Sequence, residues 1–496
     1  MATAISGVSG ASTTTVKGWA TADIAATTSA EMSALTSAQV AVMTTAQVVA
    51  INTESIASLS TATVSSLSVS QVYSLITSQI AALGTDQFSK FTTAQLAAMS
   101  TLQVKALETD DLAAITTAQI TALTTAQVAA MTTGQINNLT TAQVANLTTA
   151  QVAAMTTAQI TASSTDQVAA LKTAQLAALT TAQIAKMETD DVAAITTTRI
   201  SALTTAQVAA LTTAQVAALT TAQVVKLTTA QLVSLTTAQI AKMETDDLAA
   251  ITTVQITALT TAQVAALTTA QVSNLTTAQV ANLTTAQVAA MTTAQVVSLS
   301  TDQVAALKTA QLAALTTAQV AKMETDDVAA ITTAQITGLT TAQVAALTTA
   351  QVVALGSKQV SKLTTAQVAA FTTAQLVKME TRDVAALTTS QISGLSTGQI
   401  SALTTDQVVA LNTAQVASLT TSQIAALSTA QIAVLETADL VKLSSVQIKG
   451  LTTEQIAALT TAQVAALTTA QLVAMGTDQI VAIETADIKA FTTTQI

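Results

Sequence analysis

Seven pairs of acidic residues, in each of which Glu is followed three positions later by Asp, have the clearest potential for chemistry in this sequence. Carboxylates are hard oxygen ligands for Ca²⁺, and they also serve as general acids and bases. In four pairs a Lys-Met dipeptide comes directly before the Glu. The pairs are Glu108/Asp111, Glu188/Asp191, Glu244/Asp247, Glu324/Asp327, Glu380/Asp383, Glu436/Asp439 and Glu484/Asp487.

The spacing of these pairs argues against a dedicated site. Successive pairs lie 80, 56, 80, 56, 56 and 48 residues apart and have no Gly-containing loop, so they do not form a row of adjacent Ca²⁺ ligands. Acidic residues near a helix N-terminus, balanced by a nearby Lys, explain the same pattern. Seven copies without any His do not resemble an acid/base centre. We therefore predict no enzyme, and no catalytic, cofactor-binding or metal-binding residues.

The acidic pairs are substitutions within an eight-residue repeat, which is seen clearly at 203–210 as Leu-Thr-Thr-Ala-Gln-Val-Ala-Ala. With Leu203 as position one, Thr204 and Gln207 form a Thr-x-x-Gln capping box, which marks a helix N-terminus. Leu203 and Val208 occupy the two positions of a hydrophobic staple. Position three is almost always Thr or Ser, either because it caps some helices or because its hydroxyl meets a neighbouring coil. Each octad thus predicts its own helix start.

A single continuous helix does not fit this repeat. Eight residues over two turns require about 4.0 residues per turn instead of 3.6, so the Leu/Val stripe would drift by roughly 80° per octad. We therefore predict short helices of about five or six residues that pack into an all-α solenoid, because helices that short are unstable alone. A β-solenoid is the alternative, since Val, Ile and Thr favour strands. It would place Leu203 and Val208 on opposite faces, and the chain has only 11 Gly and no Pro for its corners.

The composition excludes several functions. Charged residues make up 9% of the chain, the formal net charge is −10 and aromatic residues make up about 1%, which disfavours nucleic-acid binding. The chain has no Cys and therefore no disulfides. No apolar run is long enough to insert into a membrane. The first residues, 1–7, have neither a basic nor an apolar segment typical of a secretory signal.

The repeat replaces ordinary domain organisation. We predict an irregular N-terminal cap at 1–18, degenerate octads at 19–90 and a regular solenoid at 91–496, with Trp19 covering the end of the core. Position six stays apolar from Val8 to Ile496, through roughly sixty octads, which indicates that every octad is packed and that no long loop protrudes. The segment 164–197 recurs at 300–333 with one change, Ile184 to Val320, so the array grew by block duplication.

The octad resembles the tandem Leu-Thr-x-x-Gln-Val/Ile repeats of large bacterial surface and secreted proteins, often labelled adhesion or haem-utilisation proteins. That resemblance implies an extracellular, structural or adhesive role. No haem ligand is carried over, because the chain has no His. We expect a rod, stalk or filament subunit that self-associates, since the last octad ends at Ile496 without a polar cap.

Two other functions remain open. A Thr-rich or Ca²⁺-stiffened face could bind glycan or ice, although position-two hydroxyls would already be used as helix caps. The missing signal also allows an intracellular ruler or scaffold.

Overall fold

The computed structural model describes residue 5 and residues 7–496, which divide into two compact units, Met1–Ile251 and Thr252–Ile496. These described residues form 59 α-helices and two short 3₁₀ helices, with no strand among them. The prediction of an all-α repeat architecture is confirmed. The β-solenoid alternative is not what forms, because each capping box starts a helix.

The helices begin at position three of successive octads and are four to six residues long. In the first unit, η1 (Val8–Gly10) precedes α1 (Thr13–Lys17), and a new helix starts every eighth residue up to α30 (Thr245–Ala250). The second unit runs in the same way from α31 (Thr253–Ala258) to α59 (Thr485–Ile488). The octad at 331–338 departs from the expectation, because its last residues form the 3₁₀ helix η2 (Ile336–Gly338) instead of an α-helix.

Helix α25 (Thr205–Ala210) shows the local rules at work. The hydroxyl of Thr204 accepts a hydrogen bond from the backbone N–H of Gln207 at 3.2 Å. In return, Oε1 of Gln207 accepts from the backbone N–H of Thr204 at 2.8 Å. Both partners of the predicted staple, Leu203 and Val208, are buried. The capping box and the staple are therefore present as the spacing predicts.

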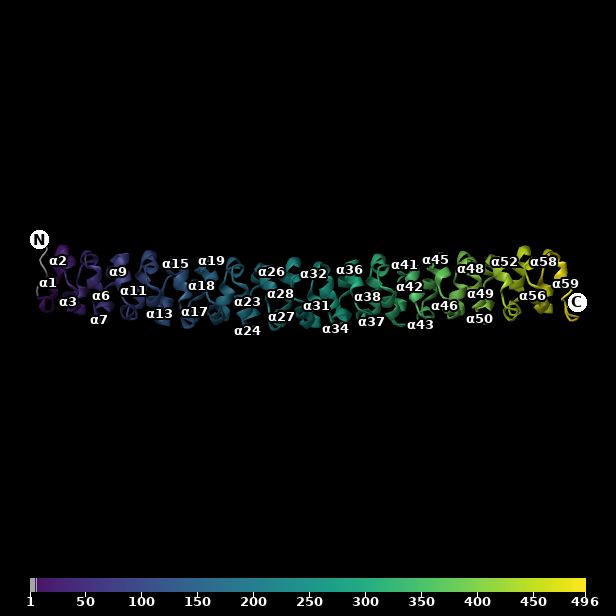
Figure 1. The fold of residues 1–496 in the computed structure, drawn as a ribbon, viewed down its shortest axis with the longest axis horizontal. Coiled ribbons are helices and arrows are strands. Elements are labelled where there is room, and N and C mark those ends of the chain that lie inside the picture. The colour runs from purple at the N-terminus through teal and green to yellow at the C-terminus, as the bar shows by residue number, and fades with distance from the viewer. Residues whose placement is uncertain (1–4, 6) are drawn as a thin grey trace. The chain divides into compact units, whose positions relative to one another are not determined.

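Within each unit the helices wind into a superhelix (Figure 1), and each helix packs on the one three octads further along the chain. In the first unit α15 (Thr125–Ala130) packs on α18 (Thr149–Ala154). In the second, α32 (Thr261–Ala266) packs on α35 (Thr285–Ala290) in the same way. Helices that are marginal alone thus gain neighbours above and below.

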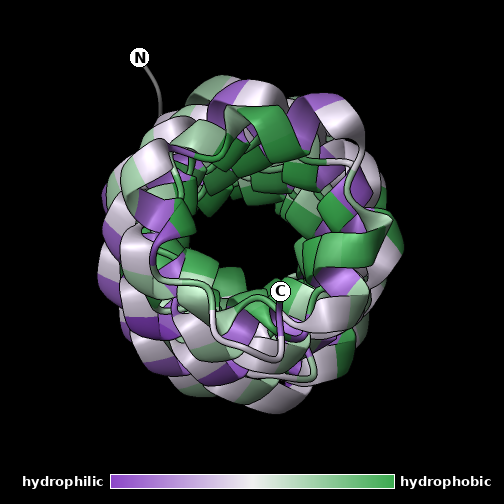
Figure 2. Cartoon of the chain, turned by 90° about the vertical axis from the view of Figure 1, so that its right-hand side faces the viewer, coloured by the Kyte–Doolittle hydropathy of each residue, from purple (hydrophilic) through white to green (hydrophobic). Residues whose placement is uncertain are grey.

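The core of each unit consists of the side chains at positions one and six. Figure 2 shows hydrophobic residues lining the inside of the second unit, which faces the viewer, and polar residues covering its outside. Leu203 and Val208 in the first unit, and Leu339 and Val344 in the second, are each no more than 3% exposed. The mean side chain is small, so a narrow superhelix can be filled without large aromatic residues.

One octad leaves this core incomplete. From Leu35 onward, position one is apolar in all octads but one. The exception is Ser163, in the octad that follows α19 (Thr157–Thr161). A cavity of about 20 Å³ lies beside Ser163, lined mainly by apolar side chains that include Val168 and Leu171. The Ser163 side chain does not fill this space with apolar atoms, and its hydroxyl donates a hydrogen bond to the carbonyl of Gln159 at 3.0 Å.

Candidate functional site

Position five, usually Gln, links consecutive superhelical turns. While Oε1 of Gln207 caps its own helix, its Nε2 donates to the carbonyl of Leu176 at 2.8 Å and to that of Leu179 at 2.7 Å. Gln407 in the second unit donates to Leu376 and Met379, both at 2.7 Å. Gln207 and Gln407 are each only 2% exposed. One buried amide group therefore caps the N-terminus of its own helix and bonds the preceding superhelical turn. We call the bonds from Nε2 to the preceding turn the inter-turn glutamine bonds.

The bonds define the size of the superhelical turn. Gln207 meets residues 31 and 28 positions earlier. Position-three hydroxyls of Ser29 and Thr469 donate to carbonyls 25 positions later. The position-eight hydroxyl of Ser66 donates to a carbonyl 29 positions earlier. These separations centre near 28 residues, or about three and a half octads per turn.

Position three is the first residue of each helix and does not cap it, and some of its hydroxyls contact a neighbouring turn. Ser37 donates to the carbonyl of Ala62 at 3.1 Å, and Thr221 donates to the carboxylate of Asp247 at 2.6 Å. In the same octads the N-caps are the position-two residues Thr36 and Thr220. This settles the alternative that the sequence left open.

Ser, Thr and Arg at position five also donate to the preceding turn. Ser55 donates to the carbonyl of Thr27 at 2.8 Å, and Thr63 donates to that of Leu35 at 3.3 Å. Arg199 donates from its guanidinium to the carbonyl of Ala169. A signal for this role was present in the sequence, since a capping box accepts Glu as well as Gln, yet Glu does not occur at position five after Glu31. A capping box needs only the acceptor, whereas the inter-turn bond needs the amide donor.

The seven acidic octads break this pattern, because their Asp occupies position five. Asp111, Asp191, Asp247 and Asp327 are each 1–3% exposed. By register, Asp111 takes the place from which a Gln would bond the carbonyls of Ile80 and Leu83, but a carboxylate has no hydrogen to donate. The Oδ2 atoms of Asp111, Asp247, Asp327 and Asp383 are buried without a hydrogen-bond partner.

Burial changes the protonation of these carboxyl groups. It raises the pKa of Asp111 and Asp327 to about 6, and the neighbouring Glu108 and Glu324 carboxylates add to the rise. The pKa of Asp247 is also raised by burial, but the bond from the Thr221 hydroxyl opposes the rise. The buried Asp111 and Asp327 carboxyl groups therefore hold a proton more readily than an exposed Asp does.

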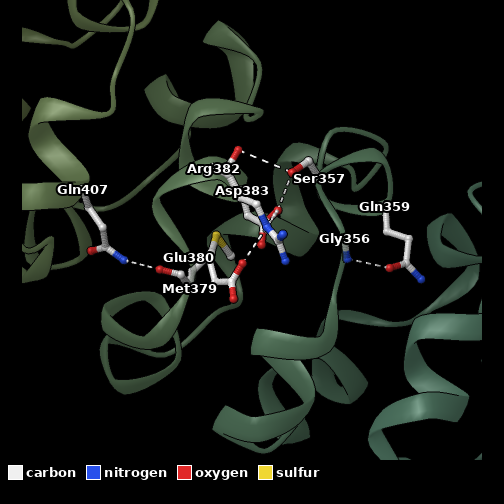
Figure 3. Close-up of polar contacts among 8 residues, drawn as sticks. All are labelled: Gly356, Ser357, Gln359, Met379, Glu380, Arg382, Asp383 and Gln407. Atoms are coloured by element: carbon white, nitrogen blue, oxygen red, sulfur yellow. Dashed lines mark hydrogen bonds and ion pairs between the residues drawn. The ribbon is translucent and has the colours of Figure 1, made fainter.

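In the octad of Asp383, a hydroxyl and a positive group lie close to the acidic side chains (Figure 3). Its Oδ1 accepts from the hydroxyl of Ser357, in the preceding turn, at 2.5 Å. Position four of this octad is Arg382, and its Nε lies 2.5 Å from Oε2 of Glu380 and 3.9 Å from Oδ1 of Asp383. A positive group therefore lies between the two acidic side chains.

The structure places each predicted acidic pair at one helix N-terminus, with Asp buried and Glu108, Glu188, Glu244 and Glu324 exposed. Among the described residues, no three acidic, His or Cys side chains converge closely enough to hold a metal ion by themselves. None of the described helices is both long and apolar enough to cross a lipid bilayer.

These features define a class of protein: an α-helical solenoid of tandem octapeptide repeats. A family model described as the ALTTAQ repeat matches most of the chain, and the chain belongs to the ALTTAQ repeat family. The matched segments are 104–141, 144–181, 184–221, 240–277, 274–301, 280–317, 320–357, 376–413, 408–437, 432–469 and 458–483. A search of curated proteins found no match.

Proposed function

We propose that this protein is a structural spacer, acting as a rod, stalk or filament subunit outside a bacterial cell. The observation that supports the proposal best is the set of inter-turn glutamine bonds. Because Gln207 and Gln407 make equivalent bonds to the turn before them, each added octad repeats the same contacts. The stability of such a stack is approximately the sum of the stabilities of its repeats and of the interfaces between neighbouring repeats. Octads can therefore be added without a change in the contacts of the others.

The uniform octads also support a mechanical role. Connections between helices are only a few residues long throughout the described chain, which leaves little backbone for mobile binding loops. Helices that stack about 8–10 Å apart, with about 28 residues per turn, give each unit of roughly 250 residues a length of about 70–90 Å. The outside carries mainly Thr, Ala and a few charged residues, a surface suited to contact with water or with other copies.

Electron microscopy of the purified chain tests the spacer role. We expect slender segments of about 70–90 Å for each unit, or ordered polymers built from them. Compact globular particles would contradict the proposal.

Location requires a separate experiment. Protease treatment of intact bacterial cells should remove the protein if it is exposed at the surface, while a cytoplasmic control protein survives. Survival of the protein in intact cells, with digestion only after lysis, would favour the intracellular ruler instead.

A further inference from the structure

Five large apolar side chains lie exposed close together in the first unit, although the repeat directs most of its large apolar residues inward. Tyr73 is 64% exposed and Leu102 is 68% exposed. Together the five present about 500 Å² of surface, as much as the largest apolar patch of a typical monomer, and such patches often mark interaction sites. We call the set the apolar strip: Val49, Val69, Tyr73, Ile76 and Leu102.

The superhelix brings these side chains together on three successive turns. They lie in or next to four helices: α5 (Thr45–Val49), α8 (Val69–Ser74), α9 (Thr77–Ala82) and α12 (Thr101–Lys105). Helix α5 packs on α8, and α9 packs on α12. With about 28 residues per turn, Val49 lies one turn before Ile76, and Leu102 lies one turn after Tyr73. The strip therefore runs along the axis of the superhelix and not around it.

Three residues of the strip depart from the rules of the octad. From residue 13 onward Val69 is the only apolar residue at position three, and from residue 28 onward Ile76 is the only large apolar residue at position two. Ile76 has no hydroxyl, so α9 lacks the side-chain cap that starts most of the helices. Tyr73 is the only Tyr in the chain. Residues that break a local folding rule, and that gather at one place, are expected at functional surfaces.

The strip carries almost no charge. By register Asp86 and Lys90 lie about half a turn from Tyr73, on the other side of the superhelix, and Glu54 lies more than a quarter of a turn away. Only Lys105 borders the strip. Nucleic acid and anionic lipid require clustered Lys and Arg, so neither fits this surface. Two copies of the chain, each with a net charge of −10, can meet here without placing like charges opposite each other.

We propose that two copies of this chain pair side by side through the apolar strip, around a two-fold axis near Tyr73. A strip that extends over three turns along the axis is the surface that two units can bury when they lie side by side. Pairing would bury about 1,000 Å² in total, the lower limit for a specific interface, so the dimer is weak. A two-fold contact needs one surface per copy, and a central aromatic residue contributes strongly to such a contact. The pairing goes beyond the spacer role, which depends on length alone.

Sedimentation velocity of the full-length chain at about 1–300 µM tests the pairing, because interfaces of this size bind weakly. We expect monomers at the lowest concentration and dimers at the highest, with little effect of salt because the strip is almost uncharged. Since Tyr73 is the only Tyr, its rate of modification by a tyrosine-specific reagent should fall over the same concentration range. A chain that stays monomeric would refute the pairing and leave the spacer role intact. A dimer in which Tyr73 reacts as fast as in the monomer would also overturn the proposal.

Returning the strip to the usual octad residues provides the specific test. The variant V69T/Y73A/I76T/L102A places Thr or Ala where the repeat normally has them, so the fold should persist and the Tm should not fall. Its dimerisation should weaken by at least about tenfold, and Y73A alone should cause much of that loss. The matched control V254A removes a Val that is 67% exposed at position four outside the strip, and it should dimerise like the natural chain.

Two results with these variants would contradict the proposal. If the fourfold variant dimerises as tightly as the natural chain, the copies pair through another surface. If the natural chain stays monomeric but binds uncharged lipid vesicles or immobilised oligosaccharide, and Y73A abolishes that binding, the strip takes a ligand other than a second copy.

Discussion

Replacement of Gln207 by Ala is the most direct test of the inter-turn glutamine bonds. The substitution removes the bond in which the Gln207 side chain accepts from the Thr204 N–H, and the bonds from its Nε2 to the carbonyls of Leu176 and Leu179 together with a longer one to Ala177. A buried hydrogen bond contributes about 0.5–1.5 kcal/mol, and a buried group left without a partner costs about 1–3 kcal/mol. We expect Q207A to lower the local free energy of opening by about 3–5 kcal/mol.

Two neighbouring substitutions separate this cost from loss of the cap. T204A removes only the hydroxyl that accepts from the Gln207 N–H, and loss of an N-cap costs about 1 kcal/mol. T205A changes an exposed position-three side chain, and its effect should stay within about 0.5 kcal/mol. A third variant, Q207E, keeps the cap acceptor but removes the amide donor, so it should weaken the stack more than T204A does.

Native-state hydrogen exchange measured by mass spectrometry is the suitable assay, because openings in a repeat array are local. Peptides that cover 176–211 should lose protection in Q207A and Q207E, while peptides several turns away keep it. If Q207A costs no more than T204A, the bonds to Leu176 and Leu179 contribute nothing and our account of the stack is wrong.

Three further predictions follow from other parts of the chain. The raised pKa of Asp111 and Asp327, about 6 against an ordinary 3.8, means that the folded state binds more protons than the unfolded state between these two pH values. Stability should therefore fall as the pH rises through about 6, and a Tm that is higher at pH 8 than at pH 5 would contradict this. Substitution S163L should fill the cavity beside Ser163 and raise stability by about 1–2 kcal/mol in thermal or chemical unfolding, whereas a loss would mean that the core cannot admit the side chain. Deletion of the whole octad 204–211 should leave a folded helical protein by circular dichroism, since the register is kept, whereas deletion of 204–207 alone should destabilise it; equal tolerance of both would show that the phase is unimportant.

The local structure could be read from the sequence because its causes lie within one octad. Thr204 and Gln207 are three residues apart, and so is the capping interaction that they form. Leu203 and Val208 are five apart, and together they bury the start of the helix. Interactions this short depend on residue type and spacing alone, so the helix starts, the helix lengths and the positions of the core side chains were predictable.

The tertiary structure alone decided what lies about 28 residues away. The second role of Gln207, the partner of the position-three hydroxyl of Thr221 and the burial of Asp247 all depend on which turn lies beside which. The sequence repeats every eight residues, so almost any whole number of octads would bring similar side chains together. The absence of Glu at position five after Glu31 hints that an amide is needed there, but the octad does not say how many octads make a turn, because that number depends on how the helices pack.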